Sequence, residues 1–163
     1  MSAKDQKLHI FFFPFMNYGH LIPTIDMAKL FASRGARTTI VTTPVNASLY
    51  LKRIQRTKNM GFEIDIQTIK FPTLEVGLPE GCENVNLIKD HDKGEEIRNK
   101  FFKATTMLQE PLEQLLKELH PTCLVADFFF PWATDVAAKF GIPRLVFHGT
   151  GFFPLCTSEC LSM

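Results

Sequence analysis

Apolar and polar residues follow two different patterns along this chain, and the changes from one pattern to the other divide it into predicted strands and helices. Short apolar or β-branched runs predict strands at residues 8–13, 37–43, 62–69, 123–126 and 143–147. Apolar residues three and four apart predict helices at residues 22–34, 44–58, 97–119 and 131–140, with another beginning after Gly151. The expected apolar face of the first helix comprises Ile22, Ile25, Ala28 and Phe31.

The alternation of strands and helices predicts an α/β fold, a Rossmann-like parallel sheet flanked by helices. The first strand is apolar on both faces and is expected to be central, whereas residues 62–69 alternate and are expected near a sheet edge. The usual strand order 3-2-1-4-5 makes strands one and four neighbours where the order reverses. Residues 71–94 form a long irregular connection that is expected to be functional or disordered, and Pro111 is expected to kink or divide its helix.

His20 and Asp127 are the candidate catalytic residues, because each closely follows one of these two neighbouring strands. Ligands of open parallel sheets bind outside the carboxyl ends of the strands, at the point where the strand order reverses. An imidazole and a carboxylate that meet there form a general base and its partner. Each residue also has a plainer interpretation. His20 suits a loop or helix cap satisfied by the backbone, and Asp127 suits the N-cap of the helix near Pro131.

Further candidates lie on the same side of the predicted sheet. The aromatic run from Phe128 to Trp132, together with Phe152 and Phe153, is suited to line an acceptor pocket, although core packing is the favoured explanation for most of these rings. His148 follows the fifth strand and is placed to touch a ligand. Gly19, Gly149 and Thr150 also lie on this side, without forming a glycine-rich phosphate loop.

Composition narrows the possible functions. The 163 residues suffice for one domain, and 18 Lys and Arg against 17 Asp and Glu do not suggest nucleic acid or an anionic membrane as a partner. No apolar stretch is long enough to span a membrane, and the polar N-terminus lacks a signal sequence, so we expect a cytoplasmic protein. Four cysteines without zinc spacing predict free thiols and no metal site. The absence of G-x-G-x-x-G, P-loop and G-x-S-x-G motifs argues against dehydrogenases, P-loop NTPases and α/β-hydrolases.

Several stretches resemble one known family. Gly19-His20-Leu21-Ile22-Pro23 within residues 9–28, and Val125-Ala126-Asp127 through Trp132, are similar to plant UDP-dependent glycosyltransferases that act on small molecules, the family 1, GT-B type. Residues 77–84 and 141–150 share this resemblance, which covers nearly the whole chain from His9 onward. Asn17 and Tyr18 depart from the small or His residues expected in the family before Gly19.

The resemblance implies that residues 1–163 are the N-terminal, acceptor-binding Rossmann-like domain of a GT-B enzyme of plant secondary metabolism. The domain is expected to be truncated, with the C-terminal UDP-sugar-binding domain absent. His20 would be the general base, and Asp127 would orient it and stabilise its imidazolium. The implied reaction transfers a sugar, expected to be glucose, with inversion to a hydroxyl of a small hydrophobic acceptor such as a flavonoid or terpenoid. The implied substrate-binding residues are Gly19, Phe128, Trp132, His148 and Thr150.

The UDP-sugar is then a co-substrate held by the missing domain, no cofactor is implied, and the fragment alone is expected to be inactive. Two other functions remain open at this point. A truncated fragment could be catalytically silent and at most bind small hydrophobic molecules. An unrelated Rossmann-like ligand-binding module would not bring His20 and Asp127 into contact.

Overall fold

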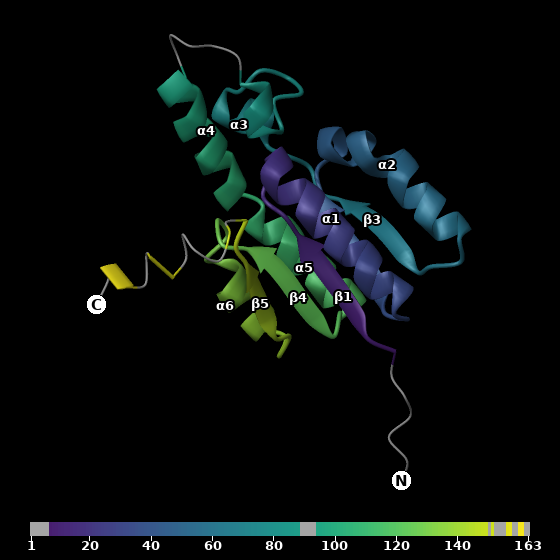
Figure 1. Cartoon of the computed structure of the whole chain (residues 1–163). Helices are drawn as coiled ribbons and strands as arrows, with labels where there is room; N and C mark the ends of the chain where they lie inside the picture. Colours follow the sequence, from purple (N-terminus) through teal and green to yellow (C-terminus); the bar gives the residue numbers. More distant parts are fainter. Residues whose placement is uncertain (1–6, 89–93, 150, 152–155, 158–159, 162–163) are drawn as a thin grey trace.

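Five parallel strands form the centre of the chain, in the order β3-β2-β1-β4-β5 (Figure 1). This is a computed structural model that describes residues 7–88, 94–149, 151, 156–157 and 160–161. The strands are β1 (His9–Phe13), β2 (Arg37–Thr42), β3 (Ile64–Thr68), β4 (Cys123–Asp127) and β5 (Arg144–Phe147). The predicted fold class and strand order are confirmed, with β1 central and β3 at one edge.

Helices cover both faces of the sheet (Figure 1). One face carries α1 (Tyr18–Ser33) and α2 (Pro44–Asn59), and the opposite face carries α4 (Gly94–Thr106), α5 (Gln109–Leu119) and α6 (Ala133–Ala138). The connection after β3 contains the short helix α3 (Thr73–Val76) and a 3₁₀ turn, η1 (Val85–Leu87). Within the described residues, no helix is both long and apolar enough to cross a bilayer.

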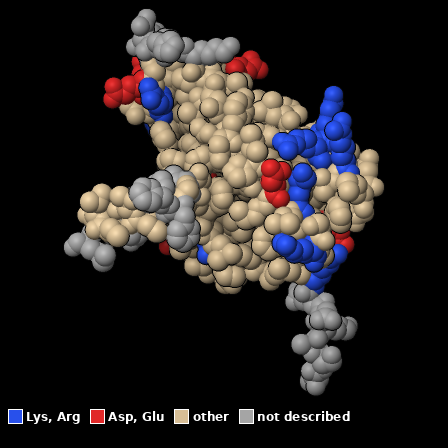
Figure 2. Space-filling view, viewed as in Figure 1, with Lys and Arg blue, Asp and Glu red and all other residues tan. Residues whose placement is uncertain are grey.

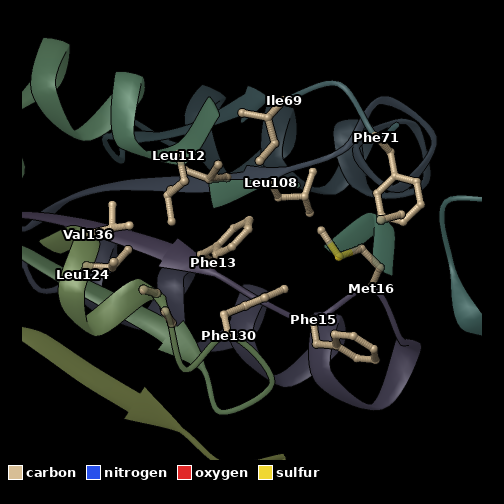
Figure 3. Packing of buried hydrophobic residues seen from close by; sticks show 14 of the residues in the cluster. Phe13, Phe15, Met16, Ile69, Phe71, Leu108, Leu112, Leu124, Phe130 and Val136 are labelled. Atoms are coloured by element: carbon tan, nitrogen blue, oxygen red, sulfur yellow. The ribbon is translucent and has the colours of Figure 1, made fainter. Parts of the chain in front are cut away.

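The core has two layers because successive side chains of a strand point to opposite faces. In β1, Ile10 and Phe12 pack toward α1 and α2, whereas Phe11 and Phe13 pack toward α4, α5 and α6. Figure 3 shows the second layer, in which Phe13 lies among Leu108, Leu112, Leu124, Phe130 and Val136. Burial on both faces explains why β1 is a continuous apolar run.

Helix α1 differs from its prediction in both its start and its buried face. It begins five residues before Pro23, and its buried positions are Leu21, Thr24, Ile25, Ala28 and Ala32. The expected face was wrong at two positions, since Ile22 is 41% and Phe31 is 37% exposed. Apolar residues occur side by side in this helix, so the pattern did not fix its rotation. The small residues Ala28 and Ala32 face the sheet, where a helix approaches most closely.

The helix predicted over residues 97–119 is divided into two helices. Division was one of the two effects expected of Pro111, the other being a kink. Helix α4 ends at Thr106 and α5 begins at Gln109, so the break precedes the proline. Pro111 lies in the first turn of α5, where a backbone N–H has no partner within the helix and its loss costs little.

Candidate active site

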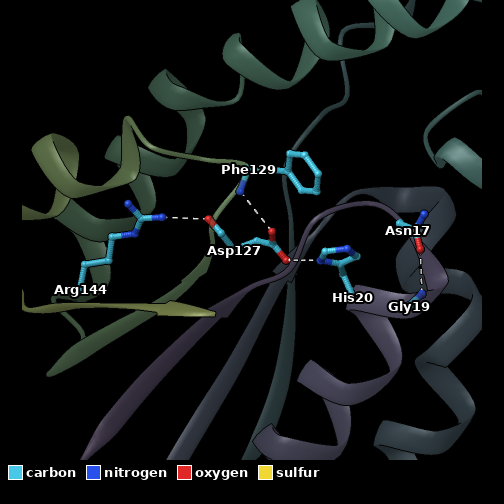
Figure 4. Close-up of polar contacts among 6 residues, drawn as sticks. All are labelled: Asn17, Gly19, His20, Asp127, Phe129 and Arg144. Atoms are coloured by element: carbon cyan, nitrogen blue, oxygen red, sulfur yellow. Dashed lines mark hydrogen bonds and ion pairs between the residues drawn. The ribbon is translucent and has the colours of Figure 1, made fainter. Parts of the chain in front are cut away.

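The register of the sheet brings His20 and Asp127 together. Phe13 at the end of β1 pairs with Ala126 of β4, so the residues that follow these positions meet at one edge. Asp127 is the last residue of β4, and His20 lies in the first turn of α1. His20 Nδ1 is 2.7 Å from Asp127 Oδ2 (Figure 4). The contact predicted for this pair is present, which contradicts a module in which the two residues do not touch.

The buried carboxylate of Asp127 indicates which ring nitrogen of His20 carries the proton. The Asp127 side chain is fully buried, whereas that of His20 is 16% exposed. Asp127 Oδ1 also accepts a hydrogen bond from the Phe129 backbone N–H at 3.2 Å. An ionised carboxylate only accepts hydrogen bonds, so contact with Asp127 favours the tautomer that carries its proton on Nδ1. The other ring nitrogen, Nε2, has no hydrogen-bond partner within the described residues and is left with a free lone pair.

Asparagine side chains fix the start of α1 and therefore the position of His20. Asn17 is the N-cap, and its Oδ1 accepts from the Gly19 backbone N–H at 2.8 Å (Figure 4). Asn86 Oδ1 accepts from the Tyr18 N–H at 2.9 Å, and the Val85 N–H donates to the Met16 carbonyl. Gly19 thus contributes a capped N–H to the helix start.

The connection that supplies Asn86 is anchored by a buried polar network. Asn84 is fully buried and donates through Nδ2 to Asn46 Oδ1 at 2.7 Å, and Asn46 Nδ2 donates to the Glu83 carbonyl and to Thr43 Oγ1. Buried amides are stable when they are satisfied by such partners. The described part of the predicted irregular connection is therefore an ordered support for the site.

Arg144 holds the segment that follows β4. Its guanidinium donates to the carbonyl oxygen of Asp127 at 2.8 Å (Figure 4). It also donates to Thr134 Oγ1 at 2.5 Å and to the Pro131 carbonyl at 3.3 Å. Burial lowers the pKa of the Arg144 guanidinium, and the negative charge of Asp127 acts in the opposite direction. Arg144 was not among the predicted site residues, although a cation beginning an apolar strand beside β4 was an available signal.

Aromatic rings form an apolar wall beside the imidazole. The ring centroids of Phe15, Phe128 and Phe129 lie 5.7, 6.1 and 5.6 Å from that of His20. Phe102 of α4 extends this wall, 5.9 Å from Phe129, and is 41% exposed. Phe129 belongs to the aromatic run that was predicted to line a pocket, whereas Phe15 and Phe102 were not predicted; for Phe102 the available signal was an aromatic residue off the buried face of its helix.

Trp132 lies apart from this wall. It packs against the core rings of Phe13 and Phe130, with centroid distances of 6.1 and 5.5 Å. These contacts agree with the core-packing interpretation of part of the aromatic run.

The segment after β5 also lies close to the imidazole. The exposed His148 ring stacks on Phe128 with centroids 4.5 Å apart and an interplanar angle of 3°. A Cβ atom at Gly149 would lie 2.5 Å from His20 Cε1 and 2.6 Å from Nδ1. Any residue with a side chain at position 149 would therefore collide with the imidazole of His20 in this arrangement. The remaining predicted contacts, Thr150, Phe152 and Phe153, lie outside the described residues.

The cysteines and the possible metal ligands of the described residues do not add to the site. The four cysteines are free, as predicted, and burial raises the pKa of the Cys82 and Cys123 thiols. Across the described ranges, no group of three or more His, Cys, Asp or Glu side chains is arranged to hold a metal ion.

Comparison with known proteins shows relatives of similar sequence. No protein-family model matches the chain. UDP-glycosyltransferase 73B3 of Arabidopsis thaliana is 56% identical over 164 residues, which cover 98% of this chain and 34% of that protein. Scopoletin glucosyltransferase of Nicotiana tabacum is 57% identical over 157 residues, covering 96% of this chain and 32% of that protein.

A solved structure shows the same arrangement. The crystal structure of Glycyrrhiza uralensis UGT73P12, complexed with glycyrrhetinic acid 3-O-monoglucuronide, has a TM-score of 0.85 and 34% identity, covering 97% of this chain and 31% of that one. The fold is that of the N-terminal domain of a GT-B glycosyltransferase. The chain is a homologue of the plant UDP-glycosyltransferases of the UGT73 type. It spans about a third of the length of the curated relatives that it matches.

Proposed function

We propose that this chain is the acceptor-binding part of an inverting, UDP-sugar-dependent glycosyltransferase. The observation that carries the proposal is the contact between His20 Nδ1 and the fully buried Asp127 carboxylate beside an aromatic wall. In this role His20 is the general base, and Asp127 fixes its tautomer and stabilises the imidazolium that forms. Homology to UDP-glycosyltransferases supports the assignment.

The proposed reaction uses the free nitrogen of the imidazole. An acceptor hydroxyl donates its hydrogen bond to His20 Nε2, and the proton moves to this nitrogen as the oxygen attacks the anomeric carbon of the sugar. The bond between that carbon and the UDP oxygen breaks from the opposite face, so the configuration inverts and UDP leaves with the electron pair. Asp127 balances the positive charge on the ring while both ring nitrogens carry protons.

The acceptor is proposed to be a small hydrophobic alcohol or phenol. Phe102, Phe128 and Phe129 offer ring faces and edges against which a planar apolar molecule can pack. Relatives of this chain include the scopoletin glucosyltransferase of Nicotiana tabacum and the UDP-glucose flavonoid 3-O-glucosyltransferase 7 of Fragaria ananassa. Glucose is accordingly the proposed sugar, and flavonoids, coumarins or terpenoids are the proposed acceptor classes.

The UDP-sugar is proposed to bind mainly outside the third of the relatives' length that this chain spans. A diphosphate needs helix N-termini, a glycine-rich loop or basic side chains. Arg144, whose guanidinium reaches this edge, is already occupied by two carbonyls and a hydroxyl. We therefore expect the chain alone to bind small hydrophobic molecules and to transfer no sugar from UDP-glucose.

The test replaces His20 by Ala in the full-length enzyme that the proposal requires. Sugar transfer to a flavonol should be abolished, while the affinity for UDP, measured by calorimetry, should change less than about twofold, because His20 acts on the acceptor. A comparable loss of UDP affinity would assign His20 to donor binding. Activity retained by His20→Ala would remove its role as the base.

A further inference from the structure

A hollow lies between the C-terminal halves of α1 and α2, away from His20 and Asp127. It is an open groove of about 550 Å³, within the range of small-molecule sites. Its nearest residue on α1, Asp26, follows His20 by six positions, or about 9 Å along the axis at 1.5 Å per residue. Its lining includes Asp26, Lys29 and Leu30 of α1, Arg53 and Arg56 of α2, and Met60 and Phe62 beyond α2.

Large apolar side chains are left open to water in this groove. Met60 is 72% exposed and Leu30 is 48% exposed, and the half-buried ring of Phe62 adjoins them. Single exposed apolar residues are ordinary on protein surfaces, but here they line one hollow. A ring or short alkyl body placed there would remove part of this apolar surface from water.

The rim of the groove has an excess of positive charge. Among the lining residues, Lys29, Arg53 and Arg56 stand against the single carboxylate of Asp26, and Figure 2 shows Lys and Arg side chains gathered over α2. The near balance of charge over the whole chain conceals this local excess. Arg56 and Lys58 also complement the dipole at the end of α2, but that role does not explain the exposed apolar residues beside them.

The carboxylate on the rim leaves this excess unbalanced. Asp26 lies 3.5 Å from Lys29 Nζ and 3.6 Å from Arg53, so two cations share one carboxylate in long, exposed ion pairs. Such pairs are weak and open readily. Arg56 has no ion pair within the described residues. A guanidinium presents several N–H donors in a planar fork that matches a carboxylate, sulfate or phosphate group.

We propose that the groove between α1 and α2 binds a small amphiphilic organic anion. The apolar body of the ligand lies against Leu30, Met60 and Phe62, and its anionic group is bound by Arg56 and Arg53. This site is separate from the pair of His20 and Asp127 and does not depend on the function proposed for that pair.

Two fluorescent probes with the same ring system test the proposal on this chain. One is 8-anilinonaphthalene-1-sulfonate, and the other is N-phenyl-1-naphthylamine, which lacks the sulfonate. Replacing both Arg53 and Arg56 by Gln should weaken binding of the sulfonate about tenfold, the value of one charge-assisted contact. Binding of the neutral probe should change less than about twofold, because the apolar lining is intact. Met60→Ser should weaken binding of both probes.

A matched control removes two exposed cations from the opposite helical layer, with Lys103→Gln and Lys117→Gln. This variant should bind both probes as the unaltered chain does. Amide chemical-shift mapping then separates the groove from the aromatic wall, where the probes also have rings to contact. With the sulfonate, shifts of the amide signals are expected along residues 26–33 and 53–60. Shifts confined to Phe128 and Phe129, or equal weakening by both double substitutions, would overturn the proposal.

Discussion

The two ends of β1 each have a histidine nearby, and the two side chains are in different chemical settings. His9 at the amino end lies 2.9 Å from Thr39 Oγ1, and burial lowers its pKa, with a smaller effect in the same direction from Arg37. His20, beyond the carboxyl end, lies 2.7 Å from a fully buried carboxylate. A hydroxyl partner satisfies a ring nitrogen, whereas a carboxylate also balances a positive charge that forms on the ring. The partner, more than the histidine, distinguishes a structural role from a chemical one.

The backbone explains why the two edges of the sheet differ. At the amino edge, the Arg37 N–H donates to the Leu8 carbonyl and the Thr122 N–H to the His9 carbonyl, so neighbouring strands are bound from their first residues. At the carboxyl edge, β1 leads into the start of α1 and a turn follows β4. The side chains of these segments therefore come together there and can form a site.

The largest expected effect separates these two histidine environments directly. In the full-length enzyme, Asp127→Asn should lower the rate of transfer on the order of 10³-fold, because the amide neither favours the productive tautomer nor balances an imidazolium. His9→Gln should leave the rate within about twofold, because the amino edge takes no part in the reaction. Steady-state rates with a flavonol acceptor measure both. Equal losses in the two variants would mean that the carboxyl edge has no special role.

Gly149→Ala tests whether the segment after β5 must lie against His20. The new Cβ would be 2.5 Å from the ring, so either the ring or the backbone must move, and a rate loss of about 10–100-fold is expected from such a displacement. Gly94→Ala at the start of α4 is the matched control, since its Cβ would meet an Arg98 nitrogen at an ordinary 3.4 Å. If both variants kept the full rate, the close approach at Gly149 would not constrain the base.

Arg144→Gln should affect stability and the pair together. Loss of the donors to Asp127, Pro131 and Thr134 should lower the free energy of unfolding by about 2 kcal/mol, measured by urea titration. A purely structural role would leave the ring nitrogen signals of His20 unchanged in the folded variant. We expect them to shift, because the arginine positions the segment that carries the carboxylate. Arg144→Lys should restore part of the stability and less of the signal position, since one ammonium cannot reproduce the fork.

The smallest effect concerns pH and the amino edge. Because the pKa of His9 is lower in the folded chain than in the unfolded one, the folded state binds fewer protons. Its contribution to stability is full above the ordinary histidine pKa and is lost as the pH falls through the lower, folded value. Urea titrations between pH 7.5 and pH 5 should show this loss, and His9→Gln should reduce it. An unchanged pH dependence in the variant would assign the effect to other groups.

The sequence was informative wherever one physical requirement dominated. Burial on both faces made β1 a continuous apolar run, and the strand order then placed His20 beside Asp127. It was uninformative where several arrangements satisfied the same pattern. Adjacent apolar residues left the rotation of α1 open, so Ile22 and Phe31 were placed wrongly.

Contacts between distant segments were beyond the sequence for the same reason. Nothing local indicates that Arg144 reaches the Asp127 carbonyl or that Asn86 caps the start of α1. The sequence also does not indicate that Gly149 lies so close to the imidazole of His20 that only a residue without a side chain fits there. These contacts depend on how β4, β5 and the connection after β3 are arranged around the same edge.

The tautomer of His20 tests the central claim most directly, and it can be measured on this chain without the sugar donor. Nitrogen-15 NMR of the ring, at a pH where it is neutral, should find the proton on Nδ1 and a free Nε2. Asp127→Asn should weaken or reverse that preference, because its amide can donate as well as accept. A proton on Nε2 in the unaltered chain, with Nδ1 unprotonated beside Asp127, would contradict the assignment of His20 as a base oriented by this carboxylate.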